Sequence, residues 1–159
     1  MIKIYSNNIK ENILIQMYNI LIENLFITYP KFLEEKEKHD NKENYKKWSN
    51  MIINTNNYYV INYFQNNEII GFLNFCIIDK ELWISEVQIK NKYKNKKIMK
   101  SLIKYFTSLN ICNNYKSVTI HINKDNILSK KVFSHIGFKS IGNTLYKIEI
   151  INLKKWSNM

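Results

Sequence analysis

Three runs of β-branched and aromatic residues follow one another between residues 58 and 89, and they restrict the fold more than any other feature. They cover Tyr58–Phe64, Ile69–Ile78 and Leu82–Ile89, and only Gln65-Asn66-Asn67 and Asp79-Lys80 separate them. Such runs favour β-strands, and short polar links between them favour tight turns. The region therefore predicts an antiparallel meander of three strands.

Helices and further strands are predicted on both sides of the meander. Before it, the sequence predicts a strand at Ile2–Tyr5, a helix from Asn8 to about Ile27 with Ile13, Met17, Ile20, Leu21 and Leu25 on one face, and a charged second helix at Lys31–Ile53. After the meander, the sequence predicts a helix with an apolar stripe at Ile98, Leu102, Tyr105, Phe106 and Leu109, and then a strand at Ser117–Ile122. It next predicts a helix at Asn126–Ile136 that ends at Gly137, and finally a hairpin of Phe138–Ile141 and Thr144–Ile150. The order β-α-α-β-β-β-α-β-α-β-β predicts a mixed α/β fold (α+β) with a largely antiparallel sheet, in a single domain spanning residues 1–159.

Composition narrows the class of protein. The formal net charge of +11 predicts an anionic partner, but the chain contains no arginine, which argues against a dedicated nucleic-acid binder. No apolar run reaches the roughly 18 residues of a membrane span, and no signal peptide is evident, so we expect a soluble, cytoplasmic protein. Cys76, Cys112 and the three scattered histidines have neither disulfide-framework nor metal-ligand spacing, so no metal is expected.

Two stretches carry a family resemblance. The first, LWISEVQIKNKYKNKKIMKSLIKYF, has a strand that ends at Ile89, an aromatic residue at Tyr93, and then a loop that opens a helix. The second, NKDNILSKKVFSHIGF, is similar to the pattern N-x-x-A-x-x-L-Y-x-x-x-G-F. In this order, they resemble the Gcn5-related N-acetyltransferase (GNAT) family, and the predicted element order is the one this family's fold would give.

The resemblance implies acetyl-CoA as the co-substrate, with its diphosphate at the start of the helix after the lysine-rich loop. A helix N-terminus suits an anion because its first N–H groups lack intrahelical partners and the helix dipole is positive there. The implied contacts are Val87, Gln88 and Ile89 from the strand, Lys94, Asn95, Lys96, Lys97, Ile98, Met99 and Lys100 from the loop, and Asn126, Ser129 and Phe133 from the next helix. The family's two loop glycines are Lys97 and Met99 here, and its leading Gln or Arg is Lys94.

The resemblance also implies transfer of an acetyl group to a primary amine, on a small molecule or a peptide. Glu86 lies on the strand where many members of the family carry a catalytic glutamate, so the resemblance implies it as the base. Strand alternation would place Trp83 and Ser85 on the other face of the sheet. His121, where some members carry a catalytic carboxylate, is a second candidate. The implied acceptor lining is Phe26, Tyr29, Phe32, Glu34 and Glu35, whose acidic members favour a cationic amine. Dimerisation is common in the family, and a homodimer is therefore an option.

Two alternatives remain open. The family's usual acid, a tyrosine, is Phe133 here, so the thiolate would leave unaided or with help from Tyr146 or water, or the domain would bind acyl-CoA with little catalysis. The other alternative is a basic nucleic-acid-binding module built on Lys90 to Lys104, which lacks an aromatic stacking platform.

Overall fold

The predicted order of elements is confirmed, and one helix is added at its end. The computed structural model describes residues 1–6, 8–29 and 41–159. Its strands are β1 (Ile2–Tyr5), β2 (Tyr58–Gln65), β3 (Glu68–Ile78), β4 (Glu81–Ile89), β5 (Ser117–His121), β6 (Lys139–Gly142) and β7 (Leu145–Glu149). Its helices are α1 (Glu11–Thr28), α3 (Asn41–Asn54), α4 (Ile98–Ser108), α5 (Ile127–Ile136) and α6 (Ile150–Asn158), and 3-10 turns lie at Asn91–Tyr93 and Asn110–Asn114. The part of the predicted second helix before Asn41 lies outside the described residues.

The strands form one seven-stranded sheet in the order β1-β2-β3-β4-β5-β7-β6. Every neighbouring pair is antiparallel except β4 and β5, which are parallel and are joined through α4. The turns of the meander fit their residues, because Asn66, Asn67, Asp79 and Lys80 all have positive φ, as tight hairpin turns require. The sheet is therefore mostly antiparallel, as predicted.

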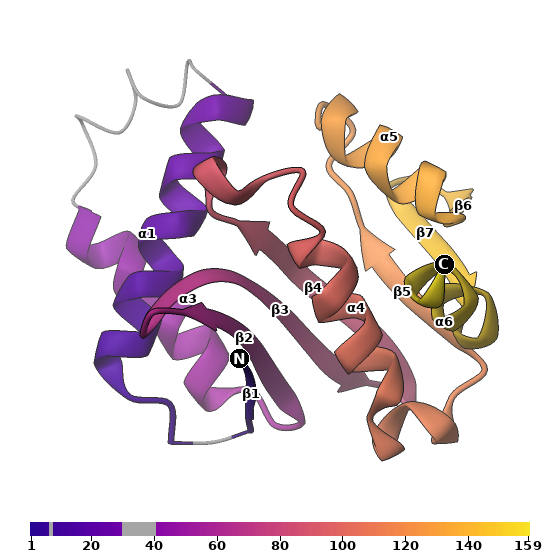
Figure 1. Ribbon diagram of the computed structural model, residues 1–159, viewed down its shortest axis with the longest axis horizontal. Coiled ribbons are helices and arrows are strands. Elements are labelled where there is room, and N and C mark those ends of the chain that lie inside the picture. The colour runs from indigo at the N-terminus through magenta and orange to yellow at the C-terminus, as the bar shows by residue number, and fades with distance from the viewer. Residues whose placement is uncertain (7, 30–40) are drawn as a thin grey trace.

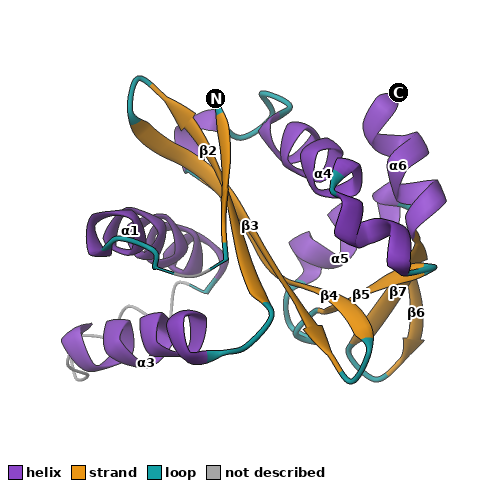
Figure 2. Cartoon of the chain, turned by 90° about the horizontal axis from the view of Figure 1, so that it is seen from below, coloured by secondary structure: helices purple, strands orange, loops and turns teal. Residues whose placement is uncertain are grey.

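Helices cover the two faces of the sheet and make two cores. Figure 2 shows α1 and α3 on one side of β2 and β3 and α4 on the other. The core under α4 includes Leu102, Phe106, Val118 and Leu153, whereas the core under α1 and α3 includes Met17 and other residues of α1, α3, β2 and β3. Strand β3 is buried at eight consecutive positions because both faces are covered.

The buried face of α1 differs from its prediction. Met17 and Ile20 are buried as expected, but the other two buried residues are Leu14 and Asn24, while Ile13, Leu21 and Leu25 are only partly buried. Asn24 turns inward because its amide donates to the Gln88 side chain and to the Ile89 carbonyl oxygen, at 2.9 and 3.0 Å. A polar contact with β4 therefore sets the rotation of the helix.

Candidate functional site

A β-bulge in β4 places the candidate base. Asn74 of β3 pairs with Glu86, but the next residue, Phe75, pairs with Ile84, so Ser85 is left without a partner in the ladder. The bulge reverses the alternation of side chains along β4. Trp83 packs in the core under α1 and α3, and the Ser85 hydroxyl donates to the Tyr58 hydroxyl of that same core at 2.9 Å. The expectation that Trp83 and Ser85 face away from Glu86 is therefore wrong.

Strands β4 and β5 pair over only three residues each. Leu82, Trp83 and Ile84 face Val118, Thr119 and Ile120, and the pairing ends there. Figure 1 shows the two strands spreading apart toward their ends. Residues 87–89, predicted to contact the co-substrate, lie beyond the last pair. Their strand therefore presents an edge without a strand partner toward β5, which suits an extended chain that carries amide groups, although the Ile89 carbonyl oxygen already accepts from Asn24.

The loop before α4 keeps a glycine-like conformation without glycine. Asn95 and Lys97 have φ of 64° and 60°, a region that side chains other than glycine and asparagine enter at a cost. Lys97 is the N-cap of α4 and makes no side-chain capping hydrogen bond, so the first N–H groups of the helix are left available. Met99 lies in the regular helix and is partly buried, so its position needs no special torsion angle.

Aromatic rings hold three lysines around this loop. The ammonium groups of Lys92 and Lys96 lie 5.0 and 5.2 Å from the centroid of the Tyr93 ring. The ammonium group of Lys100, in the first turn of α4, lies 5.8 Å from the centroid of the Trp156 ring of α6. Cation–π contacts of this kind are attractive, and they limit the freedom of long side chains. The helix start predicted to take the diphosphate is therefore surrounded by ordered positive charge.

Glu86 accepts hydrogen bonds from neutral donors on the face of the sheet opposite to α4. Its Oε2 accepts from the indole N–H of Trp48 at 3.2 Å and from the Asn74 amide at 3.5 Å, and its Oε1 accepts from the Gln88 amide at 3.4 Å. Within the described residues, no ammonium or imidazole group lies at ion-pair distance from this carboxylate. Burial raises the pKa of Glu86 to about 7, and the hydrogen bonds from Trp48 and Gln88 offset part of that rise.

A carboxylate with a pKa near neutrality can exchange a proton at physiological pH. That property is what general base catalysis requires. The side chain of Gln88, predicted to contact the co-substrate, is instead turned toward Glu86 and Asn24, and its backbone pairs with Phe72 of β3. Sequence reasoning missed Trp48, Asn74 and Asn24 as partners in this site. One signal was present, since an asparagine interrupts the apolar run GFLNFC of β3.

Buried amides extend from this site across the sheet. Asn74 and Asn62 are both fully buried, on neighbouring strands and on the face that carries Glu86. Among the described residues, no partner contacts the Oδ1 of Asn74 or either polar atom of the Asn62 amide. Buried polar atoms that lack a partner are costly in a core. This face of the sheet is therefore unusually polar beneath its two helices.

The remaining predicted residues are not gathered around Glu86. His121 is exposed at the end of β5, opposite Leu145, and its side chain makes no hydrogen bond or ion pair within the described part of the chain. The Oδ1 of Asn126 accepts from the Ser129 backbone N–H at 3.0 Å and so caps α5. The Phe133 ring packs edge-on against Phe138, with ring centroids 5.4 Å apart.

The described residues include Tyr146, the alternative acid, and only part of the predicted acceptor lining. Tyr146 of β7 is partly buried against the core under α4, and its register partners are Ile120 and Ser140. Phe26 lies in the last turn of α1, and Tyr29 follows that helix as its C-cap. Phe32, Glu34 and Glu35 lie outside the described residues.

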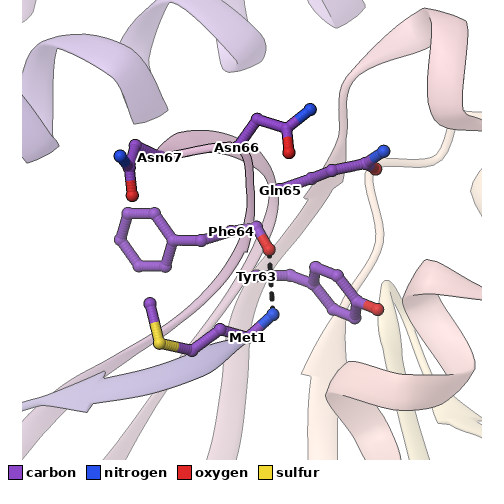
Figure 3. A pocket seen from close by; sticks show the side chains of 6 residues that line it. All are labelled: Met1, Tyr63, Phe64, Gln65, Asn66 and Asn67. Atoms are coloured by element: carbon purple, nitrogen blue, oxygen red, sulfur yellow. Dashed lines mark hydrogen bonds between the residues drawn. The ribbon is translucent and has the colours of Figure 1, made fainter.

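One cavity lies apart from all of these residues. It has a volume of 360 Å³ and is lined by residues of the β2–β3 turn and the chain start: Met1, Tyr63, Phe64, Gln65, Asn66 and Asn67. Figure 3 shows it, with the Met1 amino group donating to the Phe64 carbonyl oxygen at 2.9 Å. None of the predicted site residues lines this cavity.

Two further properties bear on the class of protein. In residues 1–6, 8–29 and 41–159, no three histidine, cysteine, aspartate or glutamate side chains are grouped so as to hold a metal ion. Within the same residues, no helix combines the length and apolar character that crossing a membrane requires.

The fold and the site together define a mixed α/β domain. In it, the bulged strand β4 and its parallel neighbour β5 separate beside the start of α4, which has no side-chain cap. The model of the acetyltransferase (GNAT) family matches residues 15–138, and the chain belongs to that family. A comparison with curated protein sequences finds no significant match.

Solved structures share the fold at low sequence identity. The PaiA N-acetyltransferase of Thermoplasma acidophilum, solved with coenzyme A, matches with a TM-score of 0.67 and 17% identity over 94% of this chain and 98% of that one. Tetrahymena Gcn5 matches with a TM-score of 0.66 and 13% identity, over 94% and 96%. The ribosomal-protein-S18-alanine N-acetyltransferase of Escherichia coli matches with a TM-score of 0.63 and 12% identity, over 94% of each chain.

Proposed function

We propose that the protein is an acetyl-CoA-dependent N-acetyltransferase that acts on a primary amine by direct transfer within a ternary complex. The observation that carries the proposal is Glu86, a partly buried carboxylate with a pKa of about 7, located in the part of β4 that has no partner on its β5 side. A base of this strength suits the removal of a proton from an ammonium group at neutral pH.

The donor would lie between β4 and β5. The backbone of Val87 and Ile89 would pair with the amides of its pantetheine arm, and the start of α4 with Lys96, Lys97 and Lys100 would bind its diphosphate. The uncapped helix start and the absence of a carboxylate at ion-pair distance from these three lysines, within the described residues, support this placement.

The chemical step would begin when the Glu86 carboxylate accepts a proton from the acceptor ammonium, directly or through a water molecule. The neutral amine nitrogen then attacks the thioester carbonyl carbon, forms the new C–N bond and passes its second proton to water. The C–S bond breaks and the electron pair leaves with the sulfur as a thiolate. Phe133 cannot protonate this thiolate, but a thiol is acidic enough to leave as the anion, and Tyr146 or water would supply the proton afterwards.

The first test is calorimetric titration with acetyl-CoA, with coenzyme A and ADP as controls, followed by thiol release with a panel of amines. We expect saturable binding, and a loss of turnover of about 100-fold or more in Glu86→Gln while donor affinity is retained. Unchanged turnover in this variant would refute the role of Glu86. If His121 assists, His121→Ala should lower turnover further, and an unaffected rate would remove it from the mechanism.

A paired test addresses the loop. Replacing Lys96 and Lys97 with glutamine should weaken acetyl-CoA binding, whereas the same change at the exposed Lys80 and Lys116, which precede β4 and β5 at their other ends, should not. Equal effects of the two double variants would mean that only the overall charge matters. Strong DNA or RNA binding that falls steeply with salt would favour the nucleic-acid alternative instead.

A second candidate function has one specific observation in its favour. The position of the family's usual tyrosine acid is occupied by Phe133, whose ring is packed against Phe138. A domain that binds acyl-CoA without turning it over would fit that packing. Saturable binding without thiol release from any amine of the panel would favour it over the enzyme.

A further inference from the structure

The C-terminal helix α6 lies against α4, and it follows the last residue matched by the family model. Leu153 is fully buried in the core under α4, which fixes the helix in place, and Trp156 is partly buried against the same core. The α6 helix therefore brings one large aromatic ring to the helix that begins at the lysine-rich loop.

The contact made by that ring is with Lys100. The Lys100 ammonium lies 5.8 Å from the Trp156 ring centroid, and Lys100 is partly buried whereas Lys96 and Lys97 are exposed. Lys100 is the third residue of α4, and side chains of an α-helix lean toward its N-terminus. The ring therefore restrains one cation near the end of the helix where an anion would bind.

The charge around this helix start has little compensation within the protein. Glu68 pairs with Lys90 and Lys92, but no described carboxylate lies at ion-pair distance from Lys96, Lys97 or Lys100. Like charges held close together repel one another, and a bound polyanion relieves that repulsion. A group of uncompensated cations at this position, of which Lys96 and Lys100 lie against aromatic rings, thus favours a phosphorylated ligand.

We propose that Trp156 is a positioning residue for the acyl donor, which acts by holding the Lys100 ammonium toward the donor's phosphate groups. The inference rests on the proposed function, because it concerns the same donor site. A lysine already restrained before binding loses less side-chain entropy when it meets a phosphate. In the family, glycines at the positions of Lys97 and Met99 let the backbone approach the phosphate groups closely. Helix α6 would then take over part of that role.

The test is a double-mutant cycle with two donors, acetyl-CoA and S-acetylpantetheine, which carries the same arm without phosphate groups. We expect Trp156→Leu to weaken acetyl-CoA binding by about three- to tenfold and to leave S-acetylpantetheine binding unchanged. Trp156→Phe should recover much of the loss, since its ring still attracts the cation. In the Lys100→Gln background, Trp156→Leu should have no further effect.

Several outcomes would overturn the inference. Equal weakening of both donors would show that Trp156 acts only through packing, and effects of Trp156→Leu and Lys100→Gln that simply add would show that the two residues act independently. If Trp156→Leu does not fold, the cycle is run with Trp156→Phe. A loss of acetyl-CoA affinity in Trp156→Phe that is equally large in the Lys100→Gln background would then refute the inference. Failure of the unaltered protein to bind acetyl-CoA would instead refute the proposed function.

Discussion

Trp48 donates its indole N–H to the Oε2 of Glu86 across 3.2 Å, and this hydrogen bond joins helix α3 to the bulged strand β4. The contact links residues 38 positions apart in the sequence. Since the hydrogen bond favours the ionised carboxylate, α3 takes part in setting the acidity of the candidate base.

Replacing Trp48 with phenylalanine should raise the pKa of Glu86 above its value of about 7, because one of the hydrogen bonds that lower it is removed. The acid limb of the profile of kcat/KM against pH should move up by about 0.5 to 1 pH unit. Trp83→Phe is the matched control, since Trp83 packs on the same face but its Nε1 has no partner in the described structure. A shift of the same size in both variants would contradict the prediction.

Glu86 should also make the fold less stable as the pH rises. Its pKa in the folded protein, about 7, lies above the ordinary value of 4.5, so between these pH values the folded state binds more protons than the unfolded state. The contribution of Glu86 to the free energy of unfolding therefore falls with rising pH across this window and is constant outside it. Relative to the unaltered protein, Glu86→Gln should gain about 2 kcal/mol between pH 5 and pH 8. Denaturant unfolding at the two pH values measures this gain, and equal differences at both would refute the assignment.

Gly71 should be required for the fit of α4 on the sheet. A Cβ atom at Gly71 would lie 2.8 Å from Ile89 Cδ1, 3.1 Å from the Gln88 carbonyl oxygen and 3.1 Å from Ile98 Cγ2. Gly71→Ala should destabilise the protein by about 1–3 kcal/mol and weaken acetyl-CoA binding, because Ile98 begins the helix at the donor site. Gly142→Ala is the comparison, since a Cβ there meets no atom within 4 Å and only the φ of 117° is unfavourable. It should reduce the melting temperature without changing donor affinity.

Lys97→Gly should stabilise the protein even though it restores flexibility. Lys97 has a φ of 60°, which glycine adopts without the steric cost that a side chain incurs. After allowing for the greater freedom of glycine in the unfolded chain, a gain of about 0.5–1 kcal/mol is expected. Lys96 does not have a positive φ, so Lys96→Gly should stabilise nothing. Urea midpoints of the two variants compare them directly, and a lower midpoint for Lys97→Gly would show that the torsion angle is not strained.

Local patterns predicted most of the fold because its strands and helices are encoded by short runs of residues. The meander, its two turns and the Gly137 cap were all visible in the sequence, and Gly137 does have the positive φ of a helix end. Of the predicted α4 stripe, Ile98, Leu102 and Phe106 are buried, whereas Tyr105 and Leu109 are only partly buried and the buried Ile103 was missed. Helix α6 was missed, because its buried apolar residues amount to little more than Leu153 and Trp156. So short a stripe does not stand out from the strand that precedes it.

The candidate site was predicted less completely than the fold. Glu86 could be named from its place in a strand, but the face it points to depends on the bulge at Ser85, and that bulge arises from pairing between β3 and β4. Its partners Trp48 and Asn74 come from other elements, which no local pattern connects to it. Asn126 and Ser129 were assigned to the donor from the family resemblance, and that assignment stays a prediction. In the structure, the Asn126 side chain accepts from the backbone N–H at position 129, a helix cap that does not depend on the serine side chain.

The two cores on opposite faces of the sheet also divide the molecule into layers that can lose order separately. Leu14, Met17 and Ile52 hold α1 and α3 against one face, while Leu102, Phe106 and Leu153 hold α4 and α6 against the other. Local opening of one helical layer need not disturb the packing of the other, so their amide hydrogens should exchange with solvent in two groups. Strand β3, buried beneath both, should exchange last. Under the proposed function, fluctuations of the layer that covers Glu86 would admit an acceptor while the layer that contains α4 stays ordered.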